Sequence, residues 1–183
     1  MTLTELFARQ TRADWGWIAL LLSAALLSSV TFACVTPFAA FAVLAAATMN
    51  PGRAFAVTAA IWLVNQALGF LALGYPFDAL TLGWGAAIGL AALAATEAAR
   101  RVLAPAVRAP WRIAAGFVAA FVAYEGALIV AALTLGGIAN FAPGIVGRLA
   151  LSDLCWLIGV GILRHGLFRL GAIRRPVPLA VRT

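Results

Sequence analysis

The sequence has 183 residues, of which 64% are hydrophobic and only 10% are charged. Soluble domains carry about 25% charged residues, so this composition excludes an ordinary soluble fold and predicts a single membrane domain over residues 1–183. The net charge of +7 comes from thirteen arginines and no lysine. Because the arginines cluster between apolar segments, they are typical of the flanks of membrane spans, and we expect no nucleic-acid binding.

The N-terminal part of the chain predicts two elements. Residues 1–14 place apolar side chains near one helical face with Arg9 and Arg12 beside them, a pattern typical of a short helix lying in the membrane interface. A first span follows over residues 15–33, entered through two tryptophans that favour the headgroup level. A basic segment before an apolar run is also typical of a signal peptide. The further apolar segment after Cys34 favours the membrane span.

A proline divides this apolar region into two helices. Pro37 lacks an amide hydrogen and clashes with a preceding helical turn, so we expect one helix to end at Thr36 and another to begin at Pro37. The second span, residues 37–49, covers roughly 20 Å at 1.5 Å per residue, which is short against a hydrocarbon core of ~30 Å. Either the bilayer thins there, or neighbouring helices shield this helix, or it ends early at a site. Its six alanines favour burial against other helices.

The third and fourth spans combine polar residues with a regular row of small ones. The third span, residues 54–74, carries Asn65 and Gln66 near its middle. The fourth, residues 79–98, has a small residue at every fourth position, which is typical of a helix-packing face, either within the chain or against a partner. This row consists of Gly83, Ala87, Ala91, Ala95 and Ala99.

The fifth span, residues 113–136, follows a basic loop at 99–112 that contains four arginines and two prolines. Such a loop is typical of the cytoplasmic side of a membrane. Tyr124 and Glu125 lie almost at the centre of this span. It therefore carries an acidic side chain near the middle of the hydrocarbon core.

The sixth span, residues 149–163, follows a loop at 137–148 that is rich in glycine and proline. Asp153 and Trp156 lie near its beginning. A basic tail over residues 164–183 ends the chain, and we expect it to be cytoplasmic.

Counting arginines predicts the topology. With the N-terminus inside, six spans place twelve arginines on the cytoplasmic side and leave only Arg148 outside. This asymmetry is a strong positive-inside signal. The sequence therefore predicts an all-α, polytopic bundle of six transmembrane helices, N-in and C-in, in a bacterial inner membrane.

Ionisable residues inside the membrane predict a functional site, because an unpaired charge in hydrocarbon is costly. Glu125 and Asn65 are expected near the midplane, and Asp153 nearer the outer side, around a polar pocket that opens outward. An alternative stays open, in which Glu125 is protonated and fastens helices through a hydrogen bond to Asn65 or a backbone carbonyl. The candidate substrate-binding residues are Cys34, Asn65, Trp84, Tyr124, Glu125, Asp153 and Trp156.

Motifs for catalysis are lacking, and we expect no enzyme, no catalytic residue and no bound cofactor. His165 is the only histidine, which excludes bis-histidine haem ligation within the chain. Cys34 and Cys155 lack the spacing of a zinc site. The sequence contains neither a phosphate-binding loop nor a GxSxG nucleophile motif.

The chain resembles the S component of energy-coupling-factor vitamin transporters. The resemblance rests on six short spans with both termini inside, rows of small residues, an outward polar pocket and the lack of an energising motif. The resemblance implies capture of a vitamin-like small molecule from the outer side. It also implies docking on a transmembrane coupling subunit that works with ATPases, usually through small residues of the first span. Here the first span offers Ala24 with Ser28 and Ala25 with Ser29, and the fourth span offers the more regular row.

The chain is similar to the solitary cobalamin-uptake type of S component in one further respect. That type uses a cysteine to ligate the cobalt of cobalamin, and Cys34 is the position that we match to it, with Cys155 as second choice. A thiolate is a good ligand for soft metals, although a cysteine in an apolar helix is more often a small hydrophobic residue. Cobalamin would then be the transported ligand. The rival hypothesis is a structural or assembly subunit of a larger membrane complex.

Overall fold

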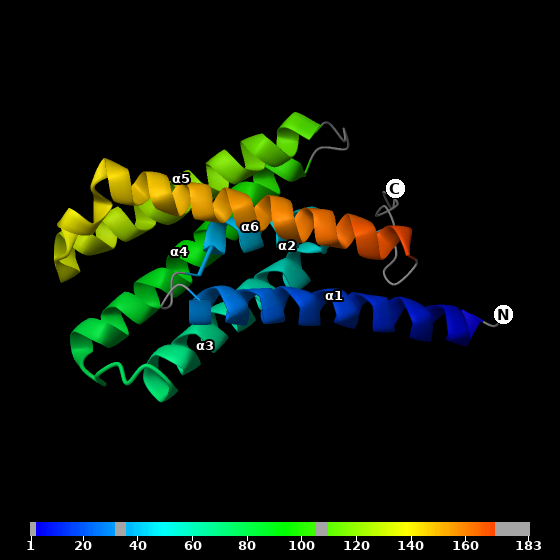
Figure 1. Ribbon diagram of the computed structural model, residues 1–183, viewed down its shortest axis with the longest axis horizontal. Helices are drawn as coiled ribbons and strands as arrows, with labels where there is room; N and C mark the ends of the chain where they lie inside the picture. Colours follow the sequence, from blue (N-terminus) through cyan, green and yellow to red (C-terminus); the bar gives the residue numbers. More distant parts are fainter. Residues whose placement is uncertain (1–2, 32–35, 105–109, 171–183) are drawn as a thin grey trace.

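The computed structural model describes residues 3–31, 36–104 and 110–170, and within these residues the chain forms helices and no strands. Figure 1 shows an elongated bundle in which successive helices run back and forth along one axis. The helices are α1 (Leu3–Thr31), α2 (Phe38–Thr48), α3 (Pro51–Leu71), α4 (Ala79–Leu103), α5 (Pro110–Leu135), the 3-10 helix η1 (Ile138–Phe141) and α6 (Pro143–Arg169).

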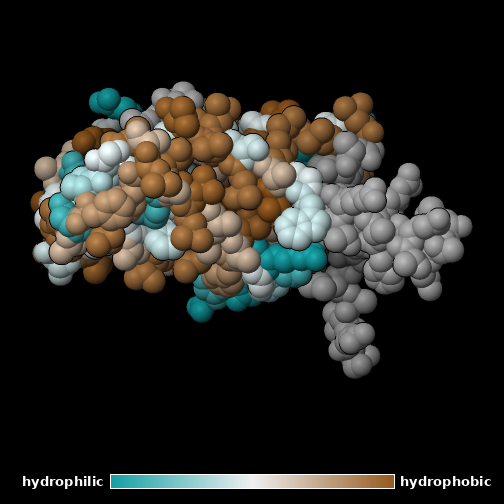
Figure 2. Space-filling view, turned by 90° about the horizontal axis from the view of Figure 1, so that it is seen from below, coloured by the Kyte–Doolittle hydropathy of each residue, from teal (hydrophilic) through white to brown (hydrophobic). Residues whose placement is uncertain are grey.

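The helical membrane architecture predicted from composition is confirmed. Among the described residues, four helices are by length and composition able to cross a membrane, namely Pro51–Leu71, Ala79–Leu103, Trp111–Leu135 and Pro143–Arg169. Figure 2 shows that hydrophobic residues cover most of the described surface on one face of the molecule, with hydrophilic residues confined to small areas. Such a surface suits contact with lipid, as expected for a multi-pass membrane protein.

The first helix is one continuous element of 29 residues. The predicted interfacial segment and the predicted first span therefore join without a break from Leu3 onward. Residues 3–31 contain no proline to end a helix between them. The described part of α1 extends to Thr31, and Thr36 itself is not helical, as expected for a break before Pro37. Cys34 lies outside the described residues.

The short helix α2 forms the centre of the bundle. It has 11 residues, and every residue from Phe38 to Ala45 is buried. It packs against α3, α4, α5 and α6. A helix that is apolar on all sides is typically surrounded by protein, so shielding by neighbouring helices explains why this predicted span is short. At 1.5 Å per residue, α2 covers only roughly 17 Å, and in Figure 1 it begins part-way along α6, behind the gap between α6 and α1.

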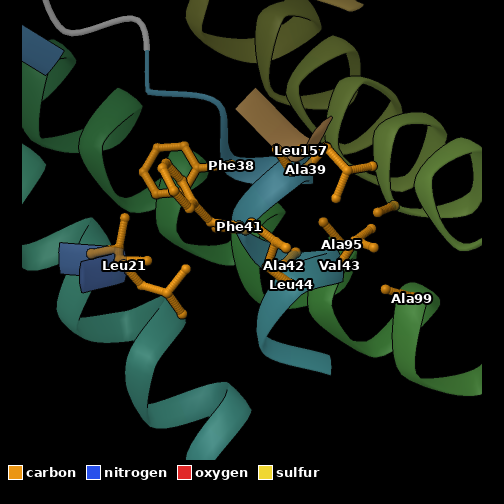
Figure 3. Close-up of a cluster of buried hydrophobic side chains, with 14 of the residues drawn as sticks. Leu21, Phe38, Ala39, Phe41, Ala42, Val43, Leu44, Ala95, Ala99 and Leu157 are labelled. Carbon is orange, nitrogen blue, oxygen red and sulfur yellow. The ribbon is translucent and has the colours of Figure 1, made fainter. Parts of the chain in front are cut away.

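The small-residue row on α4 packs inside the chain. Ala91, Ala95 and Ala99 are fully buried, and α4 has its most extensive contacts with α5 and α2. Small side chains allow such close approach of helix backbones. Figure 3 shows Ala95 and Ala99 beside Val43 of α2 in the hydrophobic core. Of the two interpretations of this row, internal packing is the one that the structure supports for these three residues.

Local sequence signals fix several helix ends. The side chain of Asn50 accepts a hydrogen bond of 2.9 Å from the backbone N–H of Arg53 and caps α3. Asp78 caps α4 in the same way through Thr81, at 2.7 Å. Two helices are longer than predicted, since α4 continues to Leu103 and α6 continues to Arg169. The first residues of the predicted basic tail are therefore helical.

Candidate functional site

The candidate residues are best described from the first turn of α2, where several of them converge. The N-cap position of α2 is Pro37, which provides no side-chain cap, so the first backbone N–H groups of the helix need other partners. Asp153 of α6 supplies one, because its Oδ1 atom accepts a hydrogen bond of 2.8 Å from the N–H of Ala40. A carboxylate at a helix N-terminus is also favoured by the helix dipole.

Glu125 of α5 is a second buried acid near this helix end. It is 6% exposed, and its Oε2 atom has no hydrogen-bond partner among the described residues. Asp153 and Glu125 lie close enough to interact electrostatically. A buried polar atom without a partner is rare in proteins and calls for an explanation. Near the beginning of α2, Glu125 Oε2 is therefore available to bind another group.

Two aromatic residues of the predicted site pack against α2. The ring of Tyr124 lies 5.7 Å from that of Phe38, and the ring of Trp156 lies 6.2 Å from that of Phe41, measured between ring centroids. Both pairs are tilted, an arrangement that aromatic rings favour. Tyr124 also interacts electrostatically with Asp153 and Glu125. Tyr124 and Trp156 thus place aromatic rings against the first turns of α2.

Asn65 lies on the other side of the same helix end, in a buried polar chain between α1 and α3. Its Nδ2 atom donates a hydrogen bond of 2.8 Å to Oγ1 of Thr36. The hydroxyls of Thr36 and Ser29 are 2.6 Å apart. Gln66 donates to Oδ1 of Asn65 at 3.3 Å. Asn65 thus bonds to Thr36 and Gln66, whereas the sequence suggests Glu125 as one alternative.

Trp84 lies in a different environment from the other candidates. It is half-buried near the start of α4, beside the connection from α5 to η1. That connection turns through Gly137, whose φ of 91° lies in the left-handed region. A Cβ atom at Gly137 would lie 3.6 Å from Cζ2 of Trp84. Trp84 thus lies against the connection from α5 to α6 at Gly137.

The structure brings Asn65, Tyr124, Glu125, Asp153 and Trp156 around the beginning of α2, but α2 itself fills the space between them. Residues 36–45 are all buried. The described arrangement is therefore a helix terminus surrounded by acids and aromatic rings. The described residues also include no group of three histidine, cysteine or acidic residues that could hold a metal ion.

Sequence reasoning missed the contributions of Thr36 and Ser29. Both are small polar residues next to the α1–α2 turn, and their buried hydroxyls complete the contact with Asn65. Their position beside a helix-breaking proline was a usable signal, because backbone groups freed at a helix end need polar partners.

Comparisons with known proteins do not add a function to this geometry. No family model, curated protein or solved structure matches the chain.

Proposed function

We propose that the protein is a membrane transport protein, or the substrate-binding subunit of one, that captures a vitamin-like small molecule from the outer side. The observation that carries this proposal is the buried, unpartnered Oε2 atom of Glu125 beside the N-terminal end of the short helix α2. Acids inside membrane proteins usually mark substrate or proton pathways. Transporters commonly build their sites from interrupted helices whose ends lie within the membrane.

We further propose six membrane segments with both termini on the cytoplasmic side of a bacterial inner membrane. Most of the described arginines lie on the helix turns near the end of the bundle where α1 begins and α6 ends, at the right of Figure 1. Arg148, in contrast, lies in the second turn of α6 at the opposite end. The positive-inside rule then assigns the arginine-rich end to the cytoplasm. In this topology α1 and α2 are the first two segments.

The proposed site requires a movement. Because Phe38 and Phe41 fill the space beside Tyr124 and Trp156, a ligand reaches Glu125 only when the first turn of α2 shifts. Asp153 holds that turn through Ala40, so the same hydrogen bond would oppose opening. Glu125 would then bind a polar group of the ligand, and the aromatic rings would contact its apolar part.

Cobalamin is the ligand that the resemblance to solitary S components favours, with Cys34 as ligand to its cobalt. A Cys34→Ser variant that binds cobalamin with an unchanged absorbance spectrum would exclude this role. In the same proposal the protein is not an enzyme, and a transmembrane coupling subunit with ATPases supplies the energy.

The transport function is tested by native mass spectrometry of the purified chain in mild detergent, followed by uptake in proteoliposomes. Glu125→Gln keeps the side-chain size and removes the carboxylate, and we expect it to lose the retained molecule and its uptake while remaining folded. Glu97→Gln is the matched control, because Glu97 pairs with Arg100 and Arg101 at the far end of α4. A Glu125→Gln variant that retains the same ligand as wild type would contradict the proposal.

The second candidate is a structural or assembly subunit of a larger membrane complex. It is favoured by the observation that Asp153 and Asn65 make hydrogen bonds that fasten helices. In this case the purified chain carries no small molecule and loses its fold without a protein partner. Native mass spectrometry therefore separates the two candidates.

A further inference from the structure

A groove separates α1 from α6. It has a volume of about 470 Å³, within the range of roughly 300–1,000 Å³ that is typical of ligand sites. Its lining includes Leu20, Ser23 and Leu27 on α1, and Cys155, Trp156 and Leu163 on α6, so Trp156 of the candidate site forms part of its wall. In Figure 1 these two helices lie side by side at the front of the bundle, with α2 behind the space between them.

The composition of the groove restricts what can occupy it. Its lining is almost wholly apolar, and Cys155 is a free, exposed thiol. A soluble polar molecule would gain few hydrogen bonds there. An alkyl chain gains contact with apolar side chains on both helices.

One end of the groove carries a positive charge. Trp17 lies on α1 one turn before Leu20, and Arg164 lies on α6 one turn after Val160, so both continue the faces that line the groove. The guanidinium carbon of Arg164 lies 5.2 Å from the centre of the Trp17 ring. The Nε atom of Arg164 is buried and has no hydrogen-bond partner among the described residues.

Trp17 is itself held in place. Its Nε1 atom donates a hydrogen bond of 2.9 Å to Oγ1 of Thr48 at the end of α2. Its ring is thereby fixed as a platform for the arginine, an arrangement stabilised by the cation–π interaction. Tryptophan and arginine together are typical of the level of lipid headgroups.

We propose that this groove binds an anionic phospholipid of the surrounding bilayer, with one acyl chain between α1 and α6 and the phosphate at Arg164. A phosphate oxygen would supply the acceptor that the Nε–H group of Arg164 lacks. A hydrophobic helix of a partner protein would fill the apolar part but would leave the positive charge of Arg164 without an anion. Charge complementarity therefore favours the lipid over a protein helix.

Photo-crosslinking with intact protein tests the proposal. The chain is reconstituted in two parallel samples of phosphatidylcholine vesicles. One sample contains a small fraction of diazirine-labelled phosphatidylglycerol, and the other contains the same fraction of diazirine-labelled phosphatidylcholine, with the diazirine on the acyl chain in both. Peptide mapping then locates the crosslinks. We expect the phosphatidylglycerol probe to label the groove segments of α1 and α6 about fivefold more than the phosphatidylcholine probe. This ratio corresponds to roughly 1 kcal/mol, the attraction of one basic residue to an anionic membrane surface.

Three variants assign this preference to the charge. Arg164→Gln should equalise the two probes, Arg164→Lys should keep most of the preference, and Arg169→Gln on the last turn of α6 should leave it unchanged. Thermal unfolding of each variant in detergent shows whether it folds. Equal labelling by both probes in the wild type overturns the proposal, as does a preference that survives Arg164→Gln. Protection of the groove from both probes would indicate a protein occupant and would also overturn it.

Discussion

Asp153 on α6 accepts a hydrogen bond from the backbone N–H of Ala40 on α2, across a separation of 113 residues in sequence. This bond replaces the cap that Pro37 does not provide. An acid that the sequence marks as a candidate ligand-binding residue thus holds the central helix to the last one. Its hydrogen bond also sits beside Glu125, where it links the stability of α2 to the proposed site.

Removing this cap should destabilise the protein. We expect Asp153→Ala to lower the free energy of unfolding by about 1–3 kcal/mol, because the N–H of Ala40 is then buried without a partner. Asp153→Asn keeps an oxygen acceptor and should cost less. Unfolding by SDS titration, followed by circular dichroism, measures the difference. Ser152→Ala serves as the neighbouring control, and an Asp153→Ala variant as stable as this control would refute the capping role.

The small-residue face of α4 should not tolerate a larger side chain. Ala95 is fully buried and Ala94 beside it is exposed. We expect Ala95→Leu to destabilise the bundle by about 1–3 kcal/mol through overpacking between α4 and α2. Ala94→Leu should change the unfolding free energy little, because its side chain points away from the core. Equal effects of the two substitutions in thermal unfolding would contradict the internal packing of this row.

A hydroxyl pair joins α3 to α4 within the core. The Oγ1 atoms of Thr58 and Thr96 are 2.9 Å apart and buried. Hydrogen bonds between membrane helices contribute on average about 0.6 kcal/mol in double-mutant cycles. A cycle with Thr58→Val and Thr96→Val should therefore give a coupling energy of about this size. A parallel cycle of Thr58→Val with the exposed Thr134→Val should give none, and coupling in both cycles would show that the effect is not specific to the pair.

Cysteine accessibility tests the proposed topology. In a Cys34→Ser, Cys155→Ser background, we expect Ala139→Cys in η1 to react with a membrane-impermeant maleimide added to intact cells. Gly52→Cys at the start of α3 should react only after the cells are permeabilised. The two positions lie at opposite ends of the bundle. The reverse pattern would place the arginine-rich end outside and would contradict the proposal.

The capping of α4 should depend on pH. The hydrogen bond from the backbone N–H of Thr81 lowers the pKa of Asp78 below its ordinary value of 3.8. The ionised carboxylate therefore stabilises the folded chain above that value, and this contribution is lost as the pH falls through the folded-state pKa. Asp78→Asn should be less stable than wild type at neutral pH, and the difference should shrink in strong acid. A difference that is independent of pH would show that the charge has no part in the cap.

Composition and single residues predicted much of the fold. Charge depletion predicted a helical membrane protein, and Pro37 predicted the division between α1 and α2. Interior helix boundaries were less predictable. No proline or glycine stops α4 within its charged last turns, where Arg100 and Arg101 pair with Glu97.

The sequence identified several polar residues that meet near the beginning of α2, but it did not show how that space is filled. Polar residues in apolar spans identified Asn65, Glu125 and Asp153, because buried polar groups need partners. The sequence does not reveal that the partner of Asp153 is a backbone N–H, since every residue carries one. The filling of the central space by Phe38 and Phe41 depends on how five helices pack, which no local pattern records.

The burial of α2 also constrains how the chain reaches its native state. A helix of 11 residues is too short to be held stably by lipid alone. Its surroundings are completed by α4, α5 and α6, which emerge from the ribosome only after it. The central helix α2 is thus synthesised early, but it gains its last packing contacts and the hydrogen bond to Asp153 only when α6 has been synthesised. A chain truncated before α6 should therefore insert into the membrane and still lack a fixed core.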